Sequence, residues 1–379
     1  MSVDLSPSDV PPRKTSRPIE QIARQYVMDP RIGRIVPGFD APFFQAGLAG
    51  YSDGAMRLVA RRHGCPYAVT EALLDQTLIS GGKGRTRENP DLLRPPAIAP
   101  TSTRGSTSPT VGGDHPIGGQ IIGSTPHEMA RSALIVLEMN YDVIDVNLAC
   151  PVRKIRRRFR GGHLLEVPEE AVAILKAVRE AVPAEVPTTV KLRRGTDDTP
   201  EAAANFQRIF DAAFDLDYAW ATVHCRTVQQ KYHGPSDWDF LTDLLRRHPD
   251  RLIFGSGDIW RVEDIFAMLD ITGVKAVAAA RGCIGNPWIF RQARQLMAGE
   301  TPTHPTIADQ RQALLEHFDL SMRLWGERAA SRMMRKFGIK FSAHHPDAEA
   351  VKNEFIKCRS AAEWRDVLDR YYGQVTDSS

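Results

Sequence analysis

The sequence predicts an α/β fold: eight parallel strands alternating with helices in a closed (β/α)8 barrel, followed by a C-terminal helical domain. Short apolar runs rich in β-branched residues alternate with helical stretches from about residue 42 onward, and most of these runs are almost continuously apolar. Such strands are typical of a parallel sheet buried on both faces. The number of runs favours a closed barrel over an open sheet, although the pattern alone fits both.

Residues 1–40 are interpreted as an N-terminal extension that is partly disordered. The first 18 residues are polar and rich in proline, which favours disorder, whereas residues 19–28 have the pattern of a short helix. The extension lacks the apolar core of a signal peptide.

The barrel is expected to span residues 41–300. Its candidate strands are 42–47, 67–71, 118–123, 143–149, 188–193, 220–224, 252–257 and 276–281. Helices are expected between them, for example over 169–182. The apolar stripe of that helix consists of Ala171, Ile174, Leu175 and Val178. A Ser/Thr/Gly-rich segment over 101–116 indicates an exposed loop or insertion.

A linker over 301–305 separates the barrel from a helical domain expected over 306–375. The apolar positions at the start of that domain are Leu314, Leu315, Phe318, Met322 and Leu324.

Composition sets further limits on function. The 379 residues include five cysteines with no C-x-x-C pair, which argues against a zinc site or a dithiol redox motif. Sparse cysteines suit a reducing cytosol, so we expect a cytoplasmic protein. No apolar run is long enough for a membrane span, and the net charge of +3 is too small to identify a partner.

Chemistry-bearing residues gather where the predicted strands end. In a (β/α)8 barrel, functional side chains come from the carboxyl ends of the strands and the loops after them. The residues at or near those ends are Asn147, Cys150, Lys191, His224, Gly257, Asp258 and Arg281.

Cys150 lies in the segment Asp145-Val-Asn-Leu-Ala-Cys-Pro151, where the proline interrupts the strand. A lone cysteine is more often a small buried apolar side chain than a reactive one. Its position at a strand end, directly before a basic loop, favours a function.

This segment resembles the D-x-N-x-G-C-P signature of the tRNA-dihydrouridine synthase family. Other motifs of that family are matched in order along residues 40–340. The matching segments are 46–50, 119–123, 190–193, 223–227, 230–238, 255–259, 281–288 and 334–336. The resemblance implies a TIM barrel, FMN as cofactor, tRNA as substrate and NADPH as a diffusible reductant.

The resemblance also implies a set of cofactor-binding residues. They are Gly47, Leu48, Ala49, Gln120, Lys191, His224, Ser256, Gly257, Asp258, Ala280 and Arg281. Lys191 is expected near N1 and O2 of the flavin, where an ammonium stabilises the negative charge of the reduced ring. Glycine-rich turns after the last two strands are expected to bind the phosphate.

Cys150 is implied as the general acid that protonates C5 of uracil after hydride reaches C6. The implied substrate-binding residues are Asn147, Arg226, Lys231 and Tyr232. The basic run over 153–160, with Phe159 available for base stacking, is expected to contact tRNA. A second basic surface is expected from Arg332, Arg335, Lys336 and Lys340.

The sequence departs from the family pattern at several positions. Gly47 and Leu48 stand where the family has Pro and Met, and Ala149 stands where it has Gly. The loop over 153–163 is more strongly altered, which bears on the choice of uridine more than on the reaction type.

Two other interpretations remain at this stage. One is an FMN-dependent barrel oxidoreductase that acts on a small molecule, and the other is an RNA-binding protein with a decayed flavin site. The basic loop argues against the first, and the combination of Cys150, Lys191 and His224 argues against the second. For the tRNA-dihydrouridine synthase interpretation, a monomer without a bound metal is expected.

Overall fold

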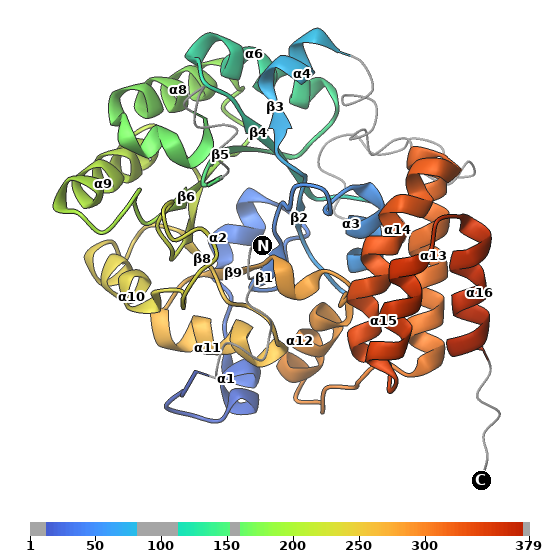
Figure 1. Cartoon of the computed structure of the whole chain (residues 1–379). Helices are drawn as coiled ribbons and strands as arrows, with labels where there is room; N and C mark the ends of the chain where they lie inside the picture. Colours follow the sequence, from blue (N-terminus) through green and yellow to red (C-terminus); the bar gives the residue numbers. More distant parts are fainter. Residues whose placement is uncertain (1–12, 82–112, 152–159, 374–379) are drawn as a thin grey trace.

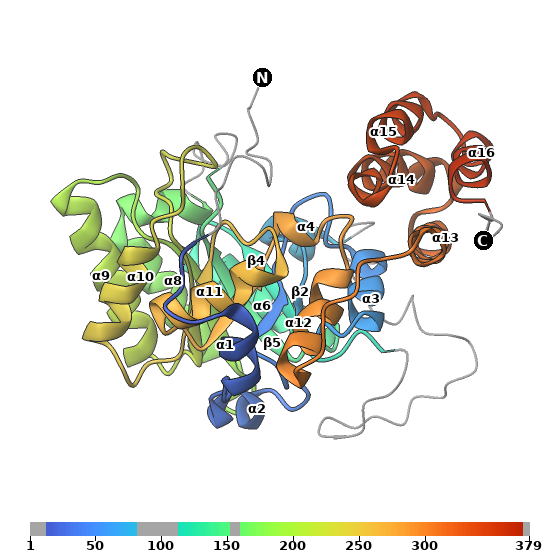
Figure 2. The same ribbon diagram turned by 90° about the horizontal axis from the view of Figure 1, so that it is seen from below.

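The computed structural model describes residues 13–81, 113–151 and 160–373. Figure 1 shows a ring of strands surrounded by helices, with a separate group of C-terminal helices at one side of the barrel. The side view in Figure 2 shows that this group stands beside the barrel and does not cap either end of it completely.

Eight parallel strands close the barrel. They are β1 (Phe43–Gln45), β2 (Ala68–Val69), β4 (Ile117–Ile122), β5 (Val143–Leu148), β6 (Thr188–Arg193), β7 (Trp220–His224), β8 (Ile253–Ser256) and β9 (Ala276–Ala279). The strands pair in sequence from β4 to β9, and β9 pairs with β1. Because β2 pairs with both β1 and β4, the ring is complete. The predicted (β/α)8 barrel is therefore confirmed.

Each predicted strand is present: two match exactly, β4 is shifted by one residue, and the other five are shorter than predicted. The predictions over 188–193 and 220–224 coincide with β6 and β7. One additional strand, β3 (Leu73–Leu74), was not predicted, and it pairs with β4 beyond the end of β2. Two residues are too few to show an alternating pattern in a sequence.

Helices cover the outside of the barrel. They are α3 (Gly54–Arg62), α4 (Asp75–Ser80), α6 (Pro126–Glu138), α8 (Pro168–Ala181), α9 (Pro200–Asp215), α10 (Trp238–Arg247), α11 (Val262–Thr272) and α12 (Trp288–Ala298). Helix α8 is the one predicted over 169–182, and its expected apolar stripe is buried. Short 3-10 helices, η3 (Gly161–Glu166) and η4 (Arg281–Cys283), follow β5 and β9.

The N-terminal segment packs against the barrel from residue 13 onward. Helix α1 (Ile19–Gln25) accounts for the predicted short helix, and α2 (Pro30–Ile35) follows it. Behind α2, Phe39 is fully buried and stacks on Tyr67 at a ring distance of 4.8 Å. The expected disorder of the first 18 residues falls largely on 1–12, which lie outside the described residues.

The barrel interior is divided into an aromatic half and a polar half. Phe39, Phe44, Tyr67, Trp220 and Phe254 form one buried cluster, which also contains the first residues of β5, β7 and β9. These rings fill the end of the barrel where the strands begin. Polar side chains occupy the other half, so a ligand has access only from the carboxyl ends of the strands.

The C-terminal region is helical, as predicted. It comprises α13 (Ile307–Trp325), α14 (Glu327–Phe341), the 3-10 helix η5 (Ser342–His344), α15 (Ala348–Lys357) and α16 (Ala361–Tyr371). Thr306 and Asp309 form a capping box at the start of α13, directly after the linker. Phe318 and Trp364 stack at 4.5 Å in the core of this helical domain.

The helical domain packs on the barrel through α3. Leu320 of α13 is buried in one apolar cluster with Ala55, Leu58 and Val59 of α3. Figures 1 and 2 both show α13 next to α3. This packing explains why α3 is buried along almost its whole length, unlike an outer barrel helix with one solvent face.

Candidate active site

Strand register brings the predicted polar residues together at one end of the barrel. Gln120 is paired with Asp145 across β4 and β5, and Asn147 is paired with Lys191 across β5 and β6. His224 on β7 is paired with Ser256 on β8. Because the strands are parallel and in this register, their carboxyl ends form a continuous polar rim.

A chain of hydrogen bonds connects three of these strands. Thr189 Oγ1 and Gln120 Nε2 each donate to the carboxylate of Asp145, both at 2.7 Å. Asn147 Nδ2 donates to Gln120 Oε1 at 2.6 Å. Burial raises the pKa of Asp145, and the two donated hydrogen bonds oppose that rise. Asp145 thereby orients the Gln120 amide, which in turn orients Asn147.

The side chain of Asn147 also sets the backbone at Cys150. Its Oδ1 accepts from the backbone nitrogens of Ala149 and Cys150, at 2.9 and 3.1 Å. These bonds fold the chain back immediately after β5, which leaves the Cys150 side chain partly exposed at the rim.

Gly161 and Gly162 pack closely against Cys150. The Gly162 nitrogen donates to the Cys150 carbonyl at 3.0 Å. Gly161 has φ +58°, and a Cβ added there would lie 2.9 Å from Cys150 Cβ. The close approach and the left-handed backbone both require glycine at position 161.

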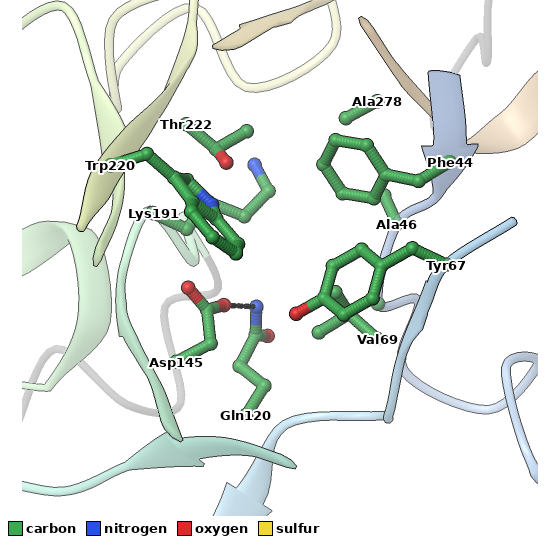
Figure 3. Close-up of a pocket in the computed structure, with 11 residues that line it drawn as sticks. Phe44, Ala46, Tyr67, Val69, Gln120, Asp145, Lys191, Trp220, Thr222 and Ala278 are labelled. Carbon is green, nitrogen blue, oxygen red and sulfur yellow. Dashed lines mark hydrogen bonds between the residues drawn. The ribbon is translucent and has the colours of Figure 1, made fainter. Parts of the chain in front are cut away.

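A small cavity lies between the aromatic and polar halves of the barrel (Figure 3). Its lining residues are Phe44, Ala46, Gly47, Tyr67, Val69, Gln120, Asp145, Lys191, Trp220, Thr222 and Ala278. Its volume of about 10 Å³ is on the order of one water molecule. The cavity is therefore too small to enclose a flavin ring.

Lys191 reaches into this space from β6, as Figure 3 shows. Burial, with the nearby charge of Arg193, lowers the pKa of Lys191 to about 8. Asp145 counteracts this through its negative charge. The ammonium therefore lies in a site where a further negative charge would be strongly stabilising.

The end of β1 comes very close to the end of β2. A Cβ added at Gly47 would lie 2.3 Å from the Thr70 carbonyl oxygen and 3.3 Å from Gln120 Oε1. Leu48 and Ala49 continue into a turn that is closed by a 2.7 Å hydrogen bond from the Leu48 nitrogen to Ser52 Oγ. Leu48 is half-buried and Ala49 is exposed at the rim.

The end of β7 and the loops after β7 and β8 present several buried donors. His224 Nε2, Arg226 Nη1 and Trp260 Nε1 are buried and have no hydrogen-bond partner among the described residues. Burial, together with surrounding cations, lowers the pKa of His224 far below its ordinary value, so the imidazole is neutral. Gly257 has φ +122°, and a Cβ there would overlap Ser236 Oγ at 2.1 Å.

Arg226 and Asp258 form a completely buried ion pair. Arg226 Nη2 donates to both carboxylate oxygens at 2.6 and 2.8 Å, and it also reaches the Gly234 carbonyl at 2.6 Å. The Ser236 nitrogen donates to the same carboxylate at 2.7 Å. Both side chains predicted to contact ligands, Arg226 for the substrate and Asp258 for the cofactor, are thus directed toward each other and hold the loop.

Tyr232 lies over two arginines at the rim. Its ring is 39% exposed, with the guanidinium carbons of Arg193 and Arg281 at 5.6 and 5.0 Å from the ring centre. Arg281 also lies 4.6 Å from the Trp260 ring centre. Ala280 is half-buried where η4 begins. The backbone carbonyl of Lys231 accepts a hydrogen bond from Arg193 Nη1 at 2.8 Å, which holds the main chain at this position.

Arg193 is a site residue that the sequence argument did not single out. It is buried, and its guanidinium donates to the carbonyls of Ala149, Thr227 and Lys231, each at 2.8 Å. It therefore joins the Cys150 strand to the loop that carries Tyr232. Its spacing of two residues from Lys191 predicts that both side chains point into the barrel, which was the available signal.

Most of the basic run over 153–160 lies outside the described residues. Its last member, Arg160, is buried and pairs with Asp75 at 2.9 Å. Of the second basic surface, Arg332 and Lys340 are exposed, whereas Arg335 and Lys336 are partly covered.

No group of three or more His, Cys, Asp or Glu side chains suited to a metal occurs within the described ranges. Among the helices of those same ranges, none combines the length and the apolar character required to cross a bilayer.

Comparison with known proteins gives a consistent result. A family model described as dihydrouridine synthase matches residues 44–375. A probable tRNA-dihydrouridine synthase of Treponema pallidum (strain Nichols) is 33% identical over 306 residues, covering 79% of this chain and 84% of the relative. tRNA-dihydrouridine synthase B of Shewanella oneidensis is 30% identical over 335 residues, covering 88% and 96%.

Among solved structures, histamine dehydrogenase from Rhizobium sp. 4-9 superimposes with a TM-score of 0.50 at 14% identity. The superposition covers 78% of this chain and 51% of that enzyme, so the chain spans about half of its length. At this identity the likeness concerns the fold alone.

Proposed function

The chain belongs to the dihydrouridine synthase family, and from this premise we propose that it reduces the C5=C6 bond of uridine in tRNA with FMN as its cofactor. The observation that carries the proposal is the arrangement of the rim. A partly exposed thiol, the Lys191 ammonium and several buried donors that have no hydrogen-bond partner among the described residues converge on the end of the barrel that polar residues line.

The residues present fit the ring of a flavin. Gly47, Leu48 and Ala49 would line one face, because the turn they form lies at the rim beside Gln120. The Gln120 amide has one hydrogen and one lone pair left after its bonds to Asp145 and Asn147. The buried ammonium of Lys191 would stabilise negative charge on the ring.

The donors at the end of β7 and after β8 fit the phosphate of the same cofactor. His224 Nε2 and Trp260 Nε1 are buried without a partner among the described residues, and an anion would satisfy such donors. The main chain at Ser256, Gly257 and Ala280 would add backbone donors, and Arg281 would add positive charge. Asp258 contributes by fixing the loop, because its carboxylate is already bonded to Arg226 and Ser236.

Reduced FMN, when bound, supplies a hydride for C6 of the uracil. Cys150 Sγ–H would deliver the proton to C5, which completes the two-hydrogen reduction. A free thiol is mostly protonated near pH 7 and can serve as an acid. Asn147 keeps Cys150 in place through two backbone hydrogen bonds and retains one amide hydrogen for the base.

The tRNA would be bound around this opening. Lys231 and Tyr232 stand at the rim, and Tyr232 presents an exposed ring on which a base can stack. The target uridine has to leave its stacked position to reach Cys150. Arg332 and Lys340 of the helical domain are exposed cations available to phosphates, and residues 153–159 are proposed for the same role.

The reductant would be NADPH, acting as a diffusible second substrate. A tRNA substrate also implies a cytoplasmic location, and we propose a monomer as the working form.

The decisive experiment maps dihydrouridine in tRNA by mass spectrometry, from a strain that lacks this gene. Complementation with the wild type should restore the modification, and Cys150→Ala should not, although the variant protein should still bind flavin. Unmodified tRNA, and not a small enone or orotate, should reoxidise the reduced protein. Reoxidation by the small molecules alone would reject a tRNA substrate.

A further inference from the structure

The turn after β1 is held between the barrel and the helical domain. The Gly50 carbonyl accepts a 2.8 Å hydrogen bond from Lys336 Nζ of α14, and the Gly50 nitrogen donates to Glu71 Oε2 at 2.7 Å. Gly50 has φ +77°, a left-handed backbone conformation that glycine adopts readily. This residue of the turn is therefore bonded through its nitrogen by the barrel and through its carbonyl by the helical domain.

A second hydrogen bond reaches the end of the same turn. Trp325 Nε1, at the last residue of α13, donates to Asp53 Oδ2 at 2.6 Å. Asp53 is fully buried and also caps α3, where its Oδ1 accepts from the Met56 nitrogen at 3.0 Å. Trp325 thereby fixes the residue at which the turn becomes α3.

The ring of Tyr51, in the same turn, also contacts the helical domain. It meets Phe337 of α14 edge to face, with ring centres 5.7 Å apart. Lys336 Nζ lies 4.8 Å from the same ring centre, a distance suited to a cation–π contact.

The sequence placed Lys336 on a surface for tRNA, but the structure directs its ammonium inward. The exposed cations of α14 are Arg332 and Lys340, whereas Lys336 is partly buried against residues 50 and 51. A lysine that is already bonded to a carbonyl and covered by a tyrosine ring is poorly placed for a phosphate.

We propose that the helical domain completes the flavin site, with Lys336 and Trp325 as positioning residues that hold the turn over 48–53 in its ligand-binding conformation. The inference rests on the proposed flavin chemistry, because the turn begins directly after Gly47 and includes Leu48 and Ala49. A turn that is fixed before binding loses less conformational entropy when the ligand arrives. The domain would thus contribute to cofactor affinity without touching the cofactor.

The effect is reciprocal. If docking of the helical domain favours flavin binding, flavin must favour docking by the same factor. The helical domain would therefore undock more easily in flavin-free protein, and proteolysis of the linker over 301–305 should be faster before flavin is added.

The test compares the flavin dissociation constants of Lys336→Met, Lys336→Arg and Lys340→Met with that of the wild type, using the full chain and added FMN. Lys336→Met should bind FMN about tenfold more weakly, which is about 1.4 kcal/mol. Lys336→Arg should restore most of the affinity, since a guanidinium can also donate to the Gly50 carbonyl. Lys340→Met is the matched control, because it removes an exposed charge one turn away.

Trp325→Phe keeps an aromatic ring and removes the indole N–H that donates to Asp53, and it should also weaken FMN binding. It decides the question if Lys336→Met fails to fold. The inference would be overturned if Lys336→Met bound FMN as tightly as the wild type. If only Trp325→Phe folds, wild-type affinity in that variant would overturn it. Either result would leave the proposed function intact. A wild type that binds no FMN would reject both.

Discussion

Asn147 and Gln120 share a 2.6 Å hydrogen bond, although the sequence assigned them to different molecules, one to uracil and the other to flavin. Gln120 Oε1 accepts the amide hydrogen of Asn147, and Gln120 Nε2 is bonded to Asp145. The two amides are thus fixed in orientation before any ligand arrives. Preorganised polar groups of this kind stabilise a reaction without a reorganisation cost.

Asn147→Ala should lower the rate of tRNA-dependent flavin reoxidation by about 10- to 100-fold. The variant leaves the backbone nitrogens of Ala149 and Cys150 without their acceptor, at a cost of roughly 1–3 kcal/mol. Flavin affinity should change much less, because Gln120 keeps its bond to Asp145. Single-turnover kinetics and a flavin titration separate the two effects.

Asn147→Asp serves as the matched control because it keeps an acceptor oxygen for both nitrogens. It loses both amide hydrogens and adds a negative charge, but because it keeps the backbone at Cys150 in place it should keep more of the rate than Asn147→Ala does. If both variants were equally slow, the donor function and not the placement of Cys150 would account for the loss.

Lys191→Met should stabilise the flavin-free protein at pH 7, by on the order of 2 kcal/mol. The folded protein releases the Lys191 proton at a pKa of about 8, whereas the unfolded chain holds it to about 10.5. The unfolded state therefore binds more protons between these values. Burial of the charged lysine therefore lowers the free energy of unfolding by its full amount below about pH 8. This loss of stability disappears as the pH rises to about 10.5.

Denaturant unfolding of both proteins between pH 7 and 10.5 measures this difference. The stability gap should narrow steadily above pH 8, because only the wild type carries the titrating lysine. A gap that stayed constant with pH would mean that Lys191 is not held in a charge-disfavouring site.

Arg226→Met should destabilise the fold strongly, by about 3–5 kcal/mol, because it leaves the Asp258 carboxylate buried without its cation. The double variant Arg226→Met with Asp258→Asn should recover part of this loss, since it removes the buried charge. Thermal unfolding measures both. Glu349→Gln, which breaks the exposed pair with Lys352, should have little effect. If Arg226→Met lowered the stability only slightly, the ion pair with Asp258 would not explain this residue, and substrate binding would again be its proposed role.

Replacing Arg156, Arg157 and Arg158 with Ala should weaken tRNA binding and flatten its dependence on salt. These residues lie outside the described part of the chain, so the expectation rests on the sequence alone. Loss of three phosphate contacts should reduce the slope of log K against log salt by roughly 2 to 3. Filter binding across a salt series measures it, with the exposed Lys176→Ala as control. An unchanged slope would reject the role.

The barrel could be predicted from the sequence because each strand is marked by its own composition. Runs such as Ala276–Ala279 are apolar along their length, and burial on both faces requires that. Once the strands were assigned, the residues at their carboxyl ends could be identified directly from the sequence. The hydrogen-bond partners of the side chains in the site could not be predicted in this way. Arg226 was expected at the substrate and Lys336 at tRNA, and both have polar contacts with parts of the chain distant in sequence.

Gly47→Ala should reduce both the stability of the protein and its affinity for FMN. The added Cβ would lie 2.3 Å from the Thr70 carbonyl, a backbone atom that cannot move without shifting β2. Thr70 also accepts a bond from the Gln120 nitrogen through its Oγ1, at 3.0 Å, so the displacement would reach the amide proposed to bind the flavin. Gly33→Ala in α2 is the control, because its nearest neighbour lies 4.0 Å away and alanine favours a helix. Melting temperatures and FMN titrations of the two variants should diverge, with Gly33→Ala at or above wild type. If Gly47→Ala retained wild-type values in both measurements, the close contact between the ends of β1 and β2 would not exist in solution.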